Sequence, residues 1–272
     1  KQLVKELREI TGAGILDCKK YLDRANNNIE EAIKLIRSEA GLKADKKGSR
    51  IAAEGIVNFY EDEEFSLILE LNSETDFVAR DNNFISLASF IAEKLLKNDI
   101  SNVKEEIDNE ISSVISKLGE NIQLRRYKKI TKDNFVFGYS HNNKISSLVE
   151  LKNNDNLLAK DICMQIVASN PLSLDEASLD SEILKSEKEI YKKELEKLDK
   201  KEDIKRNILD GKMKKFVSEN TLLNQPFVKD PSTSLSKIIK DNEIISYVRY
   251  EVGEGIEKKT EDFAKEVYNQ IS

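Results

Sequence analysis

The run Glu70-Leu71-Asn72-Ser73-Glu74-Thr75-Asp76-Phe77-Val78-Ala79-Arg80 predicts a junction between a strand and a helix. Apolar and polar residues alternate over residues 65–71, which predicts a half-buried strand, and a helical pattern begins near Asn82. Polar residues such as Thr75 cap helices or form tight turns, so the middle of the run indicates a turn at a helix start. Phe77 is an aromatic side chain within this polar turn. It is either a hydrophobic staple that packs on its own helix or a contact for another molecule.

Two blocks of the sequence predict β-hairpins. In each block two apolar runs flank a short polar turn, and helical sequence and a third strand follow. The first block pairs residues 55–60 with 65–71 and adds 122–127, and the second pairs 135–140 with 145–151 and adds 244–250. The local sequences are also alike, since Ile-Leu-Glu-Leu-Asn at 68–72 corresponds to Leu-Val-Glu-Leu-Lys at 148–152. The sequence therefore predicts an α+β fold with two similar subdomains, each a small antiparallel sheet covered by helices.

Helical patterns flank and interrupt these two subdomains. Three short helices are expected before the first block, and an amphipathic helix with Phe263, Val267 and Ile271 is expected at the end. A stretch dense in Lys and Glu predicts an antiparallel helical hairpin, which is either a protein contact or a solvated projection. The predicted domains are a three-helix N-terminal module (1–42), a linker (43–52), the first core subdomain (53–132), the second core subdomain (133–178 and 218–252), the inserted helical hairpin (179–217) and a C-terminal helical module (253–272).

Composition and motifs argue against several classes of protein. The net charge of -6, with both signs mixed, differs from the basic face that a nucleic-acid binder presents to phosphates. Cys18 and Cys163 lie far apart without a metal-ligand pattern, and His141 is the one histidine, so no metal site, cofactor or catalytic triad is expected. No apolar run approaches the ~20 residues of a membrane span. We therefore expect a cytoplasmic protein that is not an enzyme and binds neither nucleic acid nor membrane.

Several motifs resemble one known family. The run Thr75-Asp76-Phe77-Val78-Ala79-Arg80 resembles the signature of elongation factor Ts, although the family often has Lys where Arg80 stands. Residues 3–14 (LVKELREITGAG), followed by Asp17-Cys18-Lys19-Lys20, are similar to the amino-terminal module of that family, a ubiquitin-associated-like three-helix fold. Further similar stretches are residues 211–216, 223–228 and 249–258. The resemblance covers nearly the whole chain in order.

The resemblance implies a function and a set of site residues. Proteins of this family are guanine-nucleotide exchange factors that bind elongation factor Tu, both GDP-bound and nucleotide-free, and promote GDP release. The residues implied to enter the partner near its magnesium and phosphate site are Thr75, Asp76, Phe77 and Val78. The further contacts implied are Leu7, Arg8, Thr11, Gly12, Ala13, Gly14, Ile15, Asp17, Cys18, Lys19 and, in the second subdomain, His141.

The sequence leaves other functions and the oligomeric state open. One alternative is an adaptor or chaperone-like protein whose three-helix head binds peptides or ubiquitin-like folds without exchange activity. An RNA-binding translation protein is disfavoured by the net charge, and a steep salt dependence of RNA binding would favour it again. The sequence is compatible with a monomer and with a homodimer formed through the second core subdomain.

Overall fold

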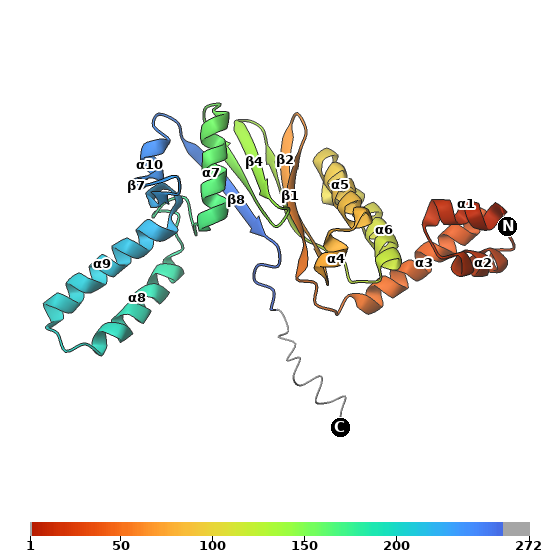
Figure 1. Ribbon diagram of the computed structural model, residues 1–272, viewed down its shortest axis with the longest axis horizontal. Helices are drawn as coiled ribbons and strands as arrows, with labels where there is room; N and C mark the ends of the chain where they lie inside the picture. Colours follow the sequence, from red (N-terminus) through yellow and green to blue (C-terminus); the bar gives the residue numbers. More distant parts are fainter. Residues whose placement is uncertain (1, 258–272) are drawn as a thin grey trace, which may run out of the picture. The chain divides into compact units, whose positions relative to one another are not determined.

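The computed structural model describes residues 2–257, so the helix predicted around Phe263 lies outside the described residues. The described chain forms two compact units. Unit 1 contains residues 2–130, 142–145 and 250–257, and unit 2 contains residues 131–141 and 146–249. Helices and antiparallel strands alternate in blocks along both units, which confirms the predicted α+β class (Figure 1). Within residues 2–257, no helix combines the length and the apolar character that crossing a membrane requires.

Unit 1 begins with three helices that share a small core. They are α1 (Gln2–Thr11), α2 (Ile15–Arg24) and α3 (Ile29–Lys47). Leu7, Cys18 and Leu22 are buried between them. The helix α3 starts at the cap Asn28, whose side chain accepts a hydrogen bond from Glu31 N at 3.1 Å. It continues to Lys47, so residues 43–47 are helical although the sequence predicted a linker from residue 43. Lysine and alanine favour helix, and residues 43–47 contain neither glycine nor proline.

The rest of unit 1 is a three-stranded antiparallel sheet with helices on one face (Figure 1). Its elements are β1 (Glu54–Glu61), β2 (Phe65–Ser73), α4 (Asp76–Ala79), α5 (Asn82–Lys97), α6 (Ile100–Leu118) and β3 (Gln123–Thr131). The strand β2 is central, and β1 pairs with it in a register that sets Ile56 opposite Leu71. Leu67, Leu69 and Leu71 pack with apolar residues of α5 and α6.

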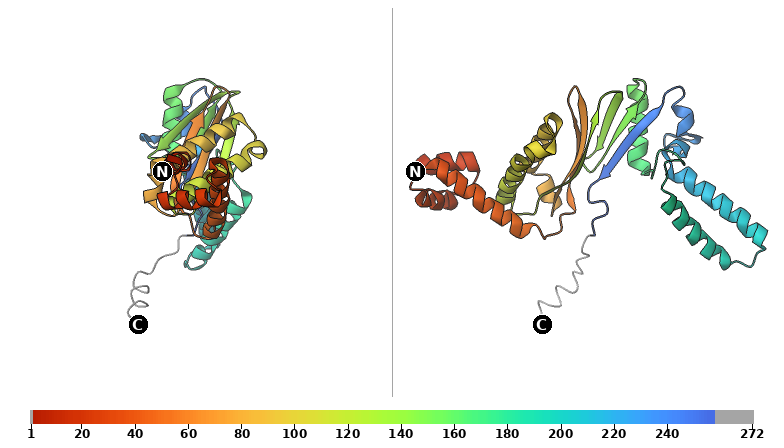
Figure 2. Two further views of the ribbon diagram at one scale, coloured as in Figure 1. Left: turned by 90° about the vertical axis from the view of Figure 1, so that its right-hand side faces the viewer. Right: turned by 180° about the vertical axis from the view of Figure 1, so that it is seen from behind.

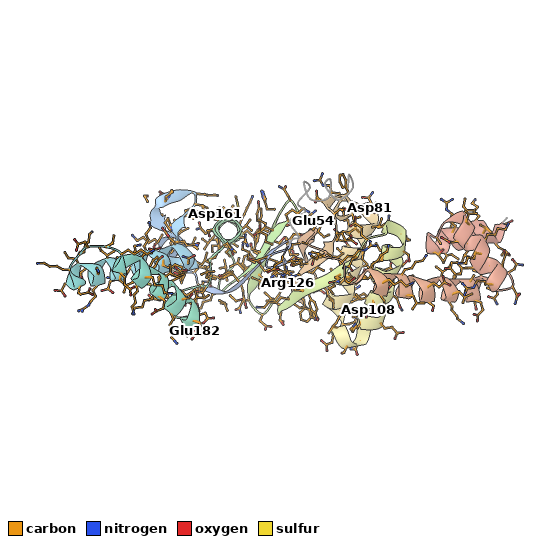
Figure 3. All side chains as sticks on the ribbon, turned by 90° about the horizontal axis from the view of Figure 1, so that it is seen from below. Glu54, Asp81, Asp108, Arg126, Asp161 and Glu182 are labelled. Carbon is orange, nitrogen blue, oxygen red and sulfur yellow. The ribbon has the colours of Figure 1, made fainter. Side chains whose placement is uncertain are left out.

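The central strand corrects one prediction from the sequence. The alternation over residues 65–71 predicted a half-buried strand, yet both faces of β2 are buried from Ser66 to Ser73. Its buried charge is Glu70, which accepts hydrogen bonds from Arg126 Nε at 2.7 Å, Arg125 Nη1 at 3.1 Å and the Gly253 amide at 2.8 Å; Figure 3 labels Arg126. A buried carboxylate is tolerated where it is paired in this way. Glu70, one of the polar residues that suggested a solvated face, therefore belongs to an internal ion-pair network.

Unit 2 is built on a second three-stranded sheet, in the order β4-β5-β8. Its elements are β4 (Phe135–His141), β5 (Ile145–Leu151), α7 (Asn156–Ser169), α8 (Ser181–Glu196), α9 (Glu202–Asn220), the 3₁₀ turn η1 (Leu222–Asn224), β6 (Pro226–Phe227), β7 (Asp230–Ser234), α10 (Leu235–Ile238) and β8 (Ile244–Glu251). The helix α7 packs on the sheet, with Val149 and Ile162 in their common core. It ends at Ser169, and its C-cap Asn170, with φ 45°, directly precedes Pro171, which disfavours helical backbone in the residue before it. The helices α8 and α9 run antiparallel, side by side (Figure 2).

Candidate functional site

The turn that carries Phe77 is a helix of a single turn. Thr75 is its N-cap: its backbone is extended (φ -121°, ψ 156°) and its hydroxyl accepts a hydrogen bond from Val78 N at 3.4 Å. The helix α4 spans only Asp76–Ala79, and the chain then turns again before α5. Asp81, labelled in Figure 3, caps α5 by accepting a hydrogen bond from Asn83 N at 2.7 Å. Each of the two helices therefore has its own N-cap, and α4 is separate from the long helix that follows.

The Phe77 side chain is exposed while its neighbours are anchored. It is 89% exposed, whereas Ala79 is 2% exposed and Val78 packs against the core of unit 1. The ring is therefore not a hydrophobic staple on its own helix, which was one of the two interpretations of the sequence. Because exposing an aromatic side chain forgoes the free energy of burying it, the position is suited to a contact with another molecule.

Glu120 holds the chain just before this turn. It lies in the loop between α6 and β3, and its Oε2 accepts hydrogen bonds from Glu74 N at 3.0 Å and Thr75 N at 2.9 Å. Its Oε1 accepts a hydrogen bond from the Thr75 hydroxyl at 2.6 Å. In return, Glu74 Oε1 accepts a hydrogen bond from Asn121 N at 2.8 Å. The two loops are thus joined by reciprocal hydrogen bonds.

Lys144 and Arg80 engage the carboxylate of Asp76. Lys144, one of residues 142–145 that belong to unit 1, donates to Asp76 Oδ1 at 2.6 Å and to Gly55 O at 2.8 Å. Arg80 donates to Asp76 Oδ2 from within the same turn. The hydrogen bond from Lys144, more than that from Arg80, holds the pKa of Asp76 below its usual range. Asp76 is therefore an ionised, doubly paired side chain at neutral pH.

The N-terminal residues of the predicted site divide into surface and core. Arg8, Gly12, Gly14, Ile15, Asp17 and Lys19 are exposed, while Thr11 and Ala13 are half-buried. Leu7 and Cys18 are each 0% exposed, so these two side chains face the interior of the three-helix core and offer no contact surface. Gly12 adopts φ +67°, a conformation that favours glycine, and its N–H donates a hydrogen bond to Arg8 O at 2.8 Å at the end of α1.

Exposed apolar side chains flank this loop. They are Ile10 at the end of α1 and Ile15 and Leu16 at the start of α2, and Leu16 is 83% exposed. Leu16 was not among the predicted site residues, although its position between Ile15 and Asp17 could have suggested it. Exposed apolar side chains of this kind are suited to a contact with another protein.

His141 lies at the end of β4, in the part of the chain assigned to unit 2. Its side chain is exposed, and its Nδ1 is 3.2 Å from the Tyr139 hydroxyl. In the described part of the chain, no group of three or more His, Cys, Asp or Glu side chains is placed to hold a metal ion. Burial raises the pKa of the Cys163 thiol to about 12, so this cysteine is poorly suited to act as a nucleophile.

Sequence reasoning missed Glu120 and Lys144. Each binds the turn across a long stretch of chain, with separations of 45 residues for Glu120 to Thr75 and 68 for Lys144 to Asp76. Neither residue lies in a motif whose spacing predicts such a contact. A charged residue in a tight loop was the only local signal, and it is typical of solvated surface.

The chain is similar to one family over almost its whole length. A family model described as "Elongation factor TS" matches residues 74–254. The elongation factor Ts of Legionella pneumophila (strain Paris) is 41% identical over 283 residues, which cover 99% of this chain and 97% of the relative. The one from Thioalkalivibrio sulfidiphilus is 42% identical over 283 residues (98% and 97% covered), and the one from a Nitratiruptor species is 44% identical over 301 residues (98% and 97% covered).

Proposed function

The chain belongs to the elongation factor Ts family, and on that premise we propose that it is a guanine-nucleotide exchange factor for elongation factor Tu. Its role as a translation elongation factor follows from the family. The proposal adds that it binds elongation factor Tu·GDP and accelerates GDP release without a bond-making or bond-breaking site of its own. The ubiquitin-associated-like character of α1–α3 and the partner contacts of the N-terminal loop and His141 are parts of the same proposal.

The exposure of Phe77 is the observation that carries this proposal. The ring is 89% exposed on a turn whose backbone is anchored by the buried Ala79. An anchored backbone with a projecting ring is suited to entering a pocket on a partner, because little conformational entropy of the backbone remains to be lost on binding. We propose that Asp76 and Phe77 enter the nucleotide-binding domain of the partner near its magnesium and phosphate site, with Phe77 as the wedge.

A single ring does not supply enough free energy for exchange. Burying one phenylalanine contributes about 1.5–3 kcal/mol. Shifting a two-state equilibrium by about 10⁴-fold requires about 5.5 kcal/mol of differential binding. The remainder has to come from other contacts, and the exposed apolar side chains of Ile10, Ile15 and Leu16 are available for them. This requirement is a physical reason for several modules of the chain to contribute binding free energy alongside Phe77.

Thermodynamic linkage connects binding to nucleotide release. A factor that prefers the nucleotide-free partner lowers the affinity for GDP by the same factor by which GDP lowers the affinity for the exchange factor. Nucleotide exchange by this route therefore requires no hydrolytic chemistry from the exchange factor. It needs only a surface that fits the nucleotide-free conformation better than the GDP-bound one.

The direct test is the release of mant-GDP from purified bacterial elongation factor Tu. The labelled complex is mixed with excess unlabelled GDP, with increasing concentrations of this protein, and the fluorescence decay is followed. We expect the release rate constant to rise with protein concentration and then to saturate. The same mixture without the protein gives the spontaneous rate. A rate constant that stays at the spontaneous value at all concentrations would contradict the proposal.

A further inference from the structure

The carboxylate of Glu120 makes three hydrogen bonds to two consecutive residues of the turn that carries Phe77. Both acceptor oxygens are used: Oε2 by the amides of Glu74 and Thr75, and Oε1 by the Thr75 hydroxyl. Hydrogen bonds to an ionised acceptor are roughly twice as strong as those between neutral groups. Glu120 is thus the principal side-chain support of the backbone immediately before Phe77.

The bond to the Thr75 hydroxyl also orients the helix cap. A hydroxyl has one hydrogen and two lone pairs. Because the hydrogen is donated to Glu120 at 2.6 Å, the lone pairs remain available to Val78 N, which lies at 3.4 Å. A hydrogen-bonded path therefore leads from Glu120 through Thr75 to the backbone of α4. Removal of the carboxylate frees the hydroxyl to rotate and weakens the cap.

The helix α4 depends on such external support. It has four residues, Asp76–Ala79, and isolated helices of this length are unstable because the cost of nucleation is not offset by propagation. On its inner side Ala79 is buried and Val78 packs against the core of unit 1. The polar contacts at the start of α4 add to this packing in fixing the direction in which Phe77 projects.

We propose that Glu120 is a positioning residue for Phe77: it holds the turn so that the ring is presented in one orientation before the partner is bound. This inference rests on the proposed exchange function and adds a residue to the machinery of that function. Pre-ordering the turn lowers the entropy that is lost when the ring enters the partner. Glu120 acts through Thr75 and Phe77, and its effect on exchange disappears when the ring is absent.

The first measurement uses Glu120→Ala, Glu120→Gln and a matched control, Glu105→Gln, which changes an exposed carboxylate of α6. For Glu120→Ala we expect the maximal stimulated mant-GDP release rate constant to fall about tenfold, the change that corresponds to the loss of hydrogen bonds to one charged group. The concentration for half-maximal stimulation should change by less than about twofold, because the other contacts are intact. Glutamine retains one acceptor oxygen and should give an intermediate rate, and Glu105→Gln should match the wild type.

The second measurement is a double-mutant cycle with Phe77→Ala. If Glu120 acts through the ring, Glu120→Ala has no further effect on release in the Phe77→Ala background, which is complete non-additivity. If the two effects multiply, Glu120 acts elsewhere and this inference is wrong, while the proposed function stands. If Phe77→Ala alone leaves release unchanged, the proposed wedge itself is wrong.

The third measurement needs no partner. Amide hydrogen exchange at Glu74 and Thr75 should accelerate in Glu120→Ala and less in Glu120→Gln, while amides of the central strand β2 remain protected. Unchanged exchange at these two amides would overturn the inference. Should Glu120→Ala fail to fold, as judged by its thermal transition, the Glu120→Gln variant carries the same three comparisons with smaller effects.

Discussion

Phe77 and Leu157 occupy corresponding places in the two units. Each is the second residue after a helix N-cap, and each cap, Thr75 or Asp155, lies four residues beyond the leucine of a Glu-Leu pair in a central strand. Both caps accept a hydrogen bond from the third residue beyond them, Val78 N at 3.4 Å and Leu158 N at 3.0 Å. Both apolar side chains are exposed, at 89% for Phe77 and 81% for Leu157. Exposure alone therefore does not distinguish the two turns.

The supports of the two turns differ. Asp155 leads directly into the regular helix α7 of 14 residues, whereas Thr75 leads into an isolated turn of four residues. The loop before the third strand contacts the turn in both units, but in unit 2 the neutral Asn242 bonds the backbone of Asn153, two positions before the cap. In unit 1 the charged Glu120 bonds the cap residue itself. On the proposed function, the hydrogen bonds that hold the turn, more than the exposure of the side chain, distinguish Phe77 from Leu157.

The largest effect is expected for Phe77→Ala. Under the proposed function the ring becomes buried when the partner binds, so its loss should lower stimulated mant-GDP release about 10- to 100-fold, from the free energy of burying one phenylalanine. Because the ring is exposed in the free protein, the free energy of unfolding should change by less than about 0.5 kcal/mol. Release assays and denaturant titrations measure the two quantities. An unchanged release rate would show that Phe77, like Leu157, does not contribute to exchange.

A smaller effect is expected for Lys144→Met, which removes the ammonium that bonds Asp76 Oδ1 and Gly55 O. Arg80 remains paired with Asp76, and partly exposed ion pairs contribute modestly, so release should slow by about two- to fivefold. Lys144→Arg keeps the positive charge and is the matched control, with a rate near that of the wild type. Equal losses in both variants would show that shape, not charge, matters at this position.

The titration of Asp76 tests the same contact without a partner. Its pKa is lowered in the folded protein, chiefly by the hydrogen bond from Lys144, so the contact is fully present above the ordinary pKa of aspartate and is lost as the pH falls through the lower, folded value. Carboxyl ¹³C NMR should therefore show a midpoint below the reference value of 3.8, with no change between about pH 5 and 8. The midpoint should rise in Lys144→Met. A midpoint that is identical in the two proteins would contradict the pairing.

The smallest effect is expected for Leu157→Ala. Leu157 is exposed at the start of a regular helix, so release and half-maximal stimulation should remain at wild-type values, and stability should change by less than about 0.5 kcal/mol. The same release and denaturation experiments apply. A loss of stimulated release comparable to that of Phe77→Ala would mean that unit 2 contributes a second apolar contact. The two turns would then not differ in function.

Local signals in the sequence predicted much of the fold. The Thr75 cap and the antiparallel pairing of β1 with β2 were both predicted from residues close together in the chain. These features depend on hydrogen bonds and sterics over a few residues, which propensity and periodicity describe well. The extent of α3 was missed because a charged, helix-favouring segment has the same composition as a linker.

The sequence by itself determined the α+β class, the strand-to-helix junction at Thr75 and the motifs that resemble a family, because all of these are properties of neighbouring residues. Only the tertiary structure decided that Phe77 is exposed, that Leu7 and Cys18 are buried, and that β2 is covered on both faces. It also brought Glu120 and Lys144 to the turn across separations of 45 and 68 residues. Contacts over such distances depend on how the whole chain packs, and no local pattern encodes which partner a charged loop residue will find.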